Sequence, residues 1–538
     1  MKHIKWITIV VAIIIVLFLI LNTNSEKRPN ILFAISDDQS FGHTGFGGSN
    51  YINTPAFDRI ASEGIYFTNC IAGSPGCAPS RSSIVTGRHH WQNEQSGQHA
   101  SSWMKKYVPF IDLLESNGYI AGRTGKGVSP FQYAIDEKDS LWRATDAGGI
   151  AHSDITYKKG TPEDERLAKG FGPVNYAANF KYFMENVRED EPFFFWYGCK
   201  EPHRKYEQDS WKRFDKNPEN VKVPGFFPDQ NIIRGDLLDY AVEIEWFDIH
   251  LQRMLTYLEK IGELENTIVI VTSDNGMPFP RAKANCYDYG IHVPMAIRFP
   301  ENFPGGRIVD DPISFVDIAP TILELTNTSS EGMMPISGSS FVNILKSDKA
   351  GVVDENRQYV FSGRERHSAS RYKNWGYPQR IIRSKEFMLI WNIKPDRWPA
   401  GAPQALVSEN SNELRPLYGI DKNGKHNKEW AFTDVGPGPT KSFIIENWEE
   451  NSIKPFFDLA SAKRPEYEFF NISSDPDCIN DLSGQTELSN IENEMKEALM
   501  KELTKSKDPR VTGTDKEVFD SYIRYSRMRY FPNPEETK

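Results

Sequence analysis

Residues 30–38 of the chain read NILFAISDD, an apolar run that ends in two aspartates. Residues 267–276, TIVIVTSDNG, repeat this pattern, and a third apolar run at 192–197, PFFFWY, is followed by Glu201 and His203. Continuous apolar runs of this length are typical of strands covered on both faces in a mainly parallel sheet. Such sheets bind ligands at the carboxyl ends of their strands, so we expect the polar residues to meet there. The predicted fold is α/β, with a mainly parallel mixed sheet sandwiched by helices.

A second, smaller domain is predicted to follow. Helical periodicity marks residues 237–261, and an irregular stretch rich in proline and glycine runs from about 394 to 439. A late helix is expected at 491–506. We therefore expect a larger N-terminal domain over residues 28–370 and a C-terminal α+β subdomain over 371–538, built on a short antiparallel sheet. The strand candidates of that sheet are residues 380–383, 387–391 and 467–471.

The composition describes a globular protein, and the N-terminus predicts export. The chain has 538 residues, of which 39% are hydrophobic, and a formal net charge of -10 that argues against a general nucleic-acid binder. Lys2, His3 and Lys5 precede an apolar run at residues 6–21. The run is slightly short for a spanning helix of about 20 residues, yet no small-residue cleavage site is evident. Residues 1–25 are therefore expected to be a signal peptide or an uncleaved membrane anchor, which places the protein in the periplasm or outside the cell.

The polar residues at two of the strand ends form a candidate cation site. Adjacent carboxylates repel each other, so acids that converge at one sheet edge are costly unless a cation lies among them. Oxygen ligands without accompanying histidine or cysteine suit Ca²⁺ or Mg²⁺ better than Zn²⁺. Each pair taken alone is an ordinary turn or helix cap. The residues are Asp37, Asp38, Asp274 and Asn275.

Residues 77–88, CAPSRSSIVTGR, contain one of five cysteines in the chain. The cysteines are scattered and odd in number, so they predict no disulfide framework. The pattern Cys-x-Pro-Ser-Arg arises by chance in a chain of this length roughly 0.3% of the time, and the trailing Thr-Gly-Arg makes coincidence rarer. The stretch resembles the signature of the type I sulfatases, a family of the alkaline phosphatase superfamily. Other motifs that carry the resemblance are GK at 125–126, PH at 202–203, SDNG at 273–276, Lys283, FVDIAPT at 315–321 and FFNISSDP at 469–476.

The resemblance implies a chemistry for Cys77. In this family a maturation enzyme, either formylglycine-generating or anaerobic sulfatase-maturating, oxidises the cysteine to formylglycine, whose hydrate is the nucleophile. Many relatives follow the Gly-Lys pair with an aromatic residue and a histidine that assists collapse of the hemiacetal, whereas residues 127–128 are Gly and Val, so that role is unassigned. The implied ligands of one Ca²⁺ are Asp37, Asp38, Cys77, Asp274 and Asn275. The implied sulfate-binding cations are Arg81, Lys126 and Lys283, with His203 as the general acid for the leaving oxygen.

Several motifs look most like the glycan-active branch of the family, which includes heparan N-sulfatases and bacterial polysaccharide sulfatases. They are EPHR at 201–204, DNGMPFP at 274–280 and YPQR at 377–380. The implied function is hydrolysis of sulfate groups from a sulfated oligosaccharide or polysaccharide, such as an algal or glycosaminoglycan-type glycan. Polar clusters near the expected domain junction supply candidate sugar contacts, because arginine forks suit sulfate and carboxylate groups. These are Arg204, Arg364, His367 and Arg380.

Three alternatives remain at this point. A heparan-type N-sulfatase would cut a nitrogen–sulfur bond instead of an ester. A phosphatase or phosphonate hydrolase of the same superfamily would share the metal-binding core, although a dizinc phosphatase needs more histidine ligands than these motifs provide. A non-catalytic glycan-binding protein would keep the basic pocket but would need no maturation cysteine.

Overall fold

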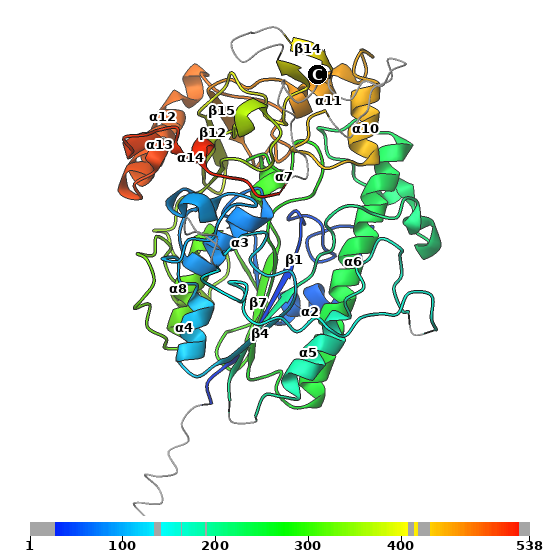
Figure 1. Ribbon diagram of the computed structural model, residues 1–538, viewed down its shortest axis with the longest axis vertical. Helices are drawn as coiled ribbons and strands as arrows, with labels where there is room; N and C mark the ends of the chain where they lie inside the picture. Colours follow the sequence, from blue (N-terminus) through cyan, green and yellow to red (C-terminus); the bar gives the residue numbers. More distant parts are fainter. Residues whose placement is uncertain are drawn as a thin grey trace, which may run out of the picture.

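The computed structural model describes residues 27–133, 141–162, 164–188, 191–406, 414–417 and 431–526 (Figure 1). The predicted signal peptide or anchor at residues 1–25 lies outside these ranges. Among the described residues, no helix combines the length and the apolar character needed to cross a membrane.

A seven-stranded mixed sheet forms the centre of the larger domain (Figure 1). The first four strands in its order are parallel, and the fifth is antiparallel to both of its neighbours. Every residue of β1, β5 and β6 is buried, which is why these strands read as nearly continuous apolar runs. The predicted mainly parallel sheet is confirmed. The strand order is β4 (Ile120–Gly125), β5 (Phe193–Gly198), β1 (Asn30–Ser36), β6 (Thr267–Ser273), β7 (Met295–Arg298), β2 (Ile65–Phe67) and β8 (Arg307–Val309).

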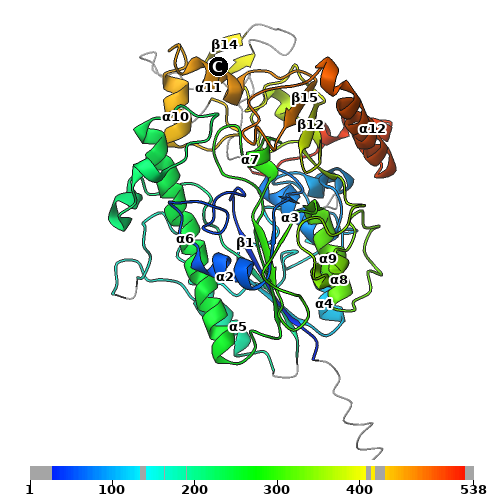
Figure 2. The same ribbon diagram turned by 180° about the vertical axis from the view of Figure 1, so that it is seen from behind.

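Helices cover both faces of this sheet (Figures 1 and 2). The side chains of β1 alternate between the two cores, with Phe33 in one and Leu32 and Ala34 in the other. The helix predicted at 237–261 is present and begins earlier, at Asn231. On one face lie α2 (Pro55–Glu63), α5 (Tyr176–Met184) and α6 (Asn231–Lys260), and on the other α3 (Cys77–Thr86), α4 (Phe110–Ser116), α8 (Ile318–Leu325) and α9 (Val342–Lys346).

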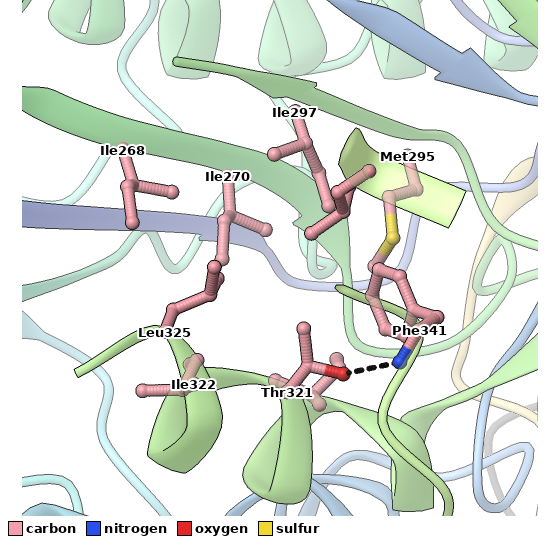
Figure 3. A pocket seen from close by; sticks show the side chains of 10 residues that line it. Ile268, Ile270, Met295, Ile297, Thr321, Ile322, Leu325 and Phe341 are labelled. Atoms are coloured by element: carbon pink, nitrogen blue, oxygen red, sulfur yellow. Dashed lines mark hydrogen bonds between the residues drawn. The ribbon is translucent and has the colours of Figure 1, made fainter. Parts of the chain in front are cut away.

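The core between the sheet and α8 is closely packed. A gap of about 10 Å³ remains there. Figure 3 shows apolar side chains that line it, such as Ile270, Ile297 and Ile322. At its edge, Thr321 Oγ1 accepts a hydrogen bond from the backbone N–H of Phe341 at 3.1 Å. A space of this size holds at most one water molecule, so it is a packing gap and not a ligand site.

A four-stranded antiparallel sheet forms the smaller domain. The helix α12 (Ser489–Lys505) packs against it through Met495 and Leu499, as predicted for the late helix. The first strand begins at Val360, inside the range predicted for the larger domain, so the predicted boundary at residue 370 cuts this sheet from its own edge strand. The strands, in order, are β10 (Val360–Arg364), β11 (Gln379–Arg383), β12 (Phe387–Asn392) and β15 (Tyr467–Asn471).

The remaining elements are short. Two-stranded pairings join β3 (Cys70–Ile71) to β9 (Ile313–Ser314) and β13 (Gln404–Leu406) to β14 (Leu414–Leu417). The other α-helices are α7 (Asp288–Ile291), α10 (Pro439–Glu446), α11 (Lys454–Ser461), α13 (Pro509–Thr512) and α14 (Val518–Ser521). The 3₁₀ helices are η1 (His90–Gln92), η2 (Glu94–Gly97), η3 (Ser210–Phe214), η4 (Pro218–Asn220), η5 (Phe315–Asp317), η6 (Tyr372–Asn374) and η7 (Thr486–Leu488).

Buried histidines predict a loss of stability in acid. Burial lowers the pKa of His43 to about 4 and that of His250 to about 3, so both are neutral in the folded protein at neutral pH. The unfolded chain protonates them near pH 6.5. Each histidine should therefore cost about 1.4 kcal/mol of unfolding free energy for every pH unit below about 6.5, until its folded pKa is reached.

The comparison that isolates this effect is the unfolding free energy of the wild type and of His250→Gln at pH 7 and pH 5. The glutamine variant should lose less stability than the wild type between these two values. Equal losses of unfolding free energy in the two proteins would show that His250 is not neutral in the folded protein.

Candidate functional site

The predicted acids converge at the carboxyl edge of the sheet. β1 and β6 are adjacent parallel strands with Ser36 beside Ser273, so Asp37 and Asp274 follow at the same level. The backbone N–H of Asp38 donates to Asp274 Oδ1 at 3.0 Å, which ties the two strand ends together. The prediction that these side chains meet is confirmed.

Cys77 lies beside these acids. It is the first residue of α3 and is 2% exposed. Asp37, Cys77 and Asp274 each offer one possible ligand atom, and these three atoms lie within 4.8 Å of one another. The N-terminal end of a helix favours an anion, so a negatively charged group bound next to Cys77 would be stabilised by α3.

Two buried oxygens at this cluster lack hydrogen-bond partners. They are Asp37 Oδ1 and Asn275 Oδ1. An unpaired buried carboxylate oxygen carries a full desolvation cost, which a divalent cation would offset. The donor set of oxygens fits a hard cation. Asp38 differs, since both of its oxygens accept from Lys283 Nζ, and its role as a metal ligand stays a prediction.

Three cations surround the acids. Lys126 Nζ lies 2.6 Å from Asp37 Oδ2, and Arg81 Nε lies 2.6 Å from Asp274 Oδ2. Lys283 binds Asp38, whose Oδ1 also accepts from Asn275 Nδ2 at 2.8 Å. Arg81 Nη2 is buried and has no acceptor. The structure therefore brings together the predicted sulfate-binding cations, with donor capacity left for an anionic ligand.

Burial and nearby charges shift the pKa values of the two acids in opposite directions and raise that of the thiol. Burial alone would raise the pKa of Asp37, but Lys126 and other nearby cations hold it well below its usual range. Burial raises the pKa of Asp274 to about 6 despite Arg81. Burial also raises the pKa of the Cys77 thiol, although Lys126 and Lys283 oppose the shift. An unmodified Cys77 would thus be a protonated, weakly nucleophilic thiol at neutral pH.

His203 faces the cluster from the loop after β5. Its Nε2 lies 4.0 Å from Asp38 Oδ2, and its Nδ1 donates to the carbonyl of Arg204 at 2.7 Å. Burial, with help from Lys283, lowers the pKa of His203 to about 4. The imidazole is therefore neutral here at neutral pH, and its protonation for a general-acid role needs the negative charge of a bound substrate.

Two of the predicted sugar contacts are held in ion pairs within the chain. Arg204 makes a two-pronged ion pair with Asp236 at 2.8 and 2.7 Å, and its guanidinium packs against two aromatic rings. Arg380 is fully buried and pairs with Glu365 and Asp508. Both guanidinium groups are occupied by acids from other parts of the chain, so neither presents its fork to a sugar.

The other two predicted sugar contacts lie close to Cys77. A Cβ placed on Gly76 would lie 3.0 Å from His367 Nδ1, so His367 is adjacent to the residue that precedes Cys77. Arg364 lines the same small recess, pairs with Asp434 at 2.9 Å and is 3% exposed. Direct sugar contact by His367 stays a prediction, whereas Arg364 lies behind the surface.

Asp434 organises this loop and was not predicted. Its carboxylate accepts from Arg364, Arg371 and the hydroxyl of Ser368, and also from Ser370. It lies in the stretch that the sequence marks only as irregular. No local motif indicates the role, because all four donors are at least 63 residues away along the chain.

Loss of Asp434 should destabilise the protein strongly. Asp434→Ala leaves two buried arginines without their common counter-charge, and we expect a loss of about 3 kcal/mol or more in unfolding free energy. Urea unfolding measures this. The matched control is Asp458→Ala, which removes an exposed partner of Lys454 and should cost less than about 1 kcal/mol. Similar small losses in both variants would contradict the assigned role.

A family model for sulfatases matches residues 29–328, which include all of the converging acids and cations. The chain belongs to the sulfatase family. This sulfatase is 24% identical over 482 residues to an ulvan-active sulfatase of Formosa agariphila, covering 85% of this chain and 73% of that protein. It is 25% identical over 413 residues to human N-sulphoglucosamine sulphohydrolase, covering 70% of this chain and 76% of the relative.

The solved structures agree on the fold. One, described as in complex with its substrate D-glucosamine-2-N,6-O-disulfate, matches this sulfatase with a TM-score of 0.61 and 20% sequence identity, covering 91% of this chain and 100% of that chain. The predicted sulfatase-like fold, with its smaller second domain, is confirmed.

Proposed function

We propose that this sulfatase hydrolyses sulfate groups from a sulfated oligosaccharide, with Cys77 converted to formylglycine and one Ca²⁺ at the acid cluster. The main support for this proposal is that Cys77 lies in a cluster with two unpartnered buried oxygens and three buried or half-buried cations. A sulfate ester is negatively charged, so it fits a site formed by a divalent cation and three cationic side chains. The relatives, which include ulvan-active and glucosamine-acting enzymes by name, support a glycan as the carrier of the sulfate.

The modified residue and the cation would supply an oxygen nucleophile that releases sulfate on collapse to the aldehyde, and Lewis-acid polarisation of a sulfate oxygen. Asp37, Asp274 and Asn275 would hold the cation, with Asp38 joining them when Lys283 turns to the substrate. Lys126, Lys283 and Arg81 would orient the sulfate and stabilise the charge that develops on its oxygens.

Proton transfer falls to His203. Its Nε2 faces the cluster while the carbonyl of Arg204 fixes the proton on Nδ1. A sulfate beside the ring would raise its pKa from about 4 and allow Nε2 to deliver a proton to the leaving sugar oxygen. Lys283, which also contacts Asp38, would assist.

The proposal includes two steps outside the active site. Residues 1–25 would direct export, so that the enzyme acts in the periplasm, in the medium or on the membrane surface. A formylglycine-generating or anaerobic maturating enzyme would recognise the extended segment around Cys77 before folding, because Cys77 is buried in the folded protein.

Release of sulfate and phosphate from matched esters tests the proposal against its alternatives. The wild type, matured in the producing cell, should release sulfate from a sulfated sugar much faster than phosphate from the same sugar phosphate. An N-sulfated sugar in parallel distinguishes a heparan-type N-sulfatase. Faster release of phosphate than of sulfate would favour the phosphatase alternative. Binding of the glycan without hydrolysis of any ester would favour the binding-protein alternative.

A further inference from the structure

A cavity of about 360 Å³ lies between the loop after His203 and two helices. The helices are α6 and α10, which lie side by side in both views (Figures 1 and 2). The segments that line the cavity are Arg204 to Gln208, the first turns of α6, and residues 437–446 around the start of α10. Apart from the backbone carbonyl of Arg204, which bonds to His203, none of these groups has a part in the mechanism above.

The cavity begins one residue from the candidate general acid. Arg204 lines it and directly follows His203, whose Nε2 is 4.0 Å from Asp38. Arg204 Nε also donates to the carbonyl of Pro278 at 3.0 Å, in the loop that carries Asn275. The cavity therefore adjoins the loop that carries His203, the group proposed to protonate the leaving oxygen of the substrate.

The charged groups at the floor of the cavity are satisfied. Asp236 pairs with Arg204 and also accepts from the N–H and the hydroxyl of Thr440, at 3.1 and 2.6 Å. Asp239 accepts from the hydroxyl of Ser210 and from two backbone N–H groups. A floor whose acids are already paired offers no strong site for a free cation or a second anionic group.

The walls combine apolar faces with exposed polar groups. Tyr206 and Phe443 are half-buried, and Ile232 is 41% exposed. Lys205 and Gln208 are exposed at the rim. Aromatic faces with a few hydrogen-bonding groups suit a ligand that has both a C–H face and hydroxyl groups. A neutral sugar ring has this chemistry.

We infer that this cavity holds a neutral sugar residue next to the one that bears the sulfate. The inference rests on the proposed function, since it assumes a glycan at the site, and it adds which part of the glycan is recognised and where. Occupation of the cavity would favour an oligosaccharide over the sulfated monosaccharide, through KM rather than through the chemical step.

The test compares a sulfated monosaccharide with its glycoside carrying one neutral sugar, in the matured enzyme. Phe443→Ala should lower kcat/KM for the longer substrate roughly fivefold and leave the monosaccharide unchanged. Gln208→Ala, at an exposed rim position, should give a smaller loss of the same kind and does not disturb packing. Phe443→Leu keeps apolar bulk without the ring and should behave like the alanine variant if ring stacking carries the effect.

Trp448→Ala is the matched control, because Trp448 is 43% exposed and lies outside the cavity lining. This substitution should leave kcat/KM unchanged for both substrates. Equal losses on both substrates in Phe443→Ala and Gln208→Ala, or no loss on the longer one, would overturn the inference. A wild type that releases no sulfate from any ester would instead overturn the proposed function.

Discussion

Cys77→Ala is expected to abolish sulfate release, with a loss of at least about 10⁴-fold in kcat. Alanine cannot be converted to formylglycine and leaves no oxygen nucleophile at the start of α3. The side chain is small and sits at a helix end, so the fold should persist. Sulfate release at saturating substrate, together with the unfolding temperature, measures both expectations.

Cys286→Ala is the matched control, since Cys286 is also buried but packs in an apolar cluster with Tyr287 and Ile291. It should keep the activity of the wild type apart from a modest loss of stability. Substantial sulfate release by Cys77→Ala would mean that the nucleophile is a different group.

Asp37→Asn is expected to lower sulfate release by more than about 100-fold and to weaken the binding of Ca²⁺. The substitution keeps the shape of the side chain and removes one negative charge from the cluster. Ca²⁺ should raise the unfolding temperature of the chelated wild type, because it binds the folded state, and should have little effect on the variant. Metal content and calorimetry provide the measurements.

Asp310→Asn, which removes a partially exposed partner of Lys385, is the control and should respond to Ca²⁺ as the wild type does. If Zn²⁺ alone restored sulfate release to the chelated wild type, the result would contradict a hard-cation site. An unfolding temperature of the wild type that does not respond to Ca²⁺ would contradict the assignment of that ion.

The sheet and the cluster could be predicted because their signals are local. Apolar runs that end in acids mark β1 and β6, and both strands lie where the sequence places them. The segment that starts at Cys77 carries its helix, its cation Arg81 and its family resemblance within a few residues. Strand ends in a parallel sheet then bring these separate motifs together.

The ion pairs that hold Arg204 and Arg380 could not be predicted, for the opposite reason. A surface arginine and a buried ion pair look the same in sequence, because the partner acids lie far along the chain. Asp508 is 128 residues from Arg380, and Asp236 is 32 residues from Arg204. The edge strand of the smaller sheet was missed for a similar reason, since β10 joins that sheet only through its pairing with β11. Long-range pairing of this kind leaves no periodicity in the sequence.

The most direct test of the account is the mass of the peptide that contains Cys77, taken from protein that releases sulfate. The account predicts that residue 77 is an aldehyde in the active fraction, that activity rises with the converted fraction, and that Arg81 and the rest of the peptide are unmodified. Protein that releases sulfate at full rate while residue 77 remains an unmodified thiol would contradict it.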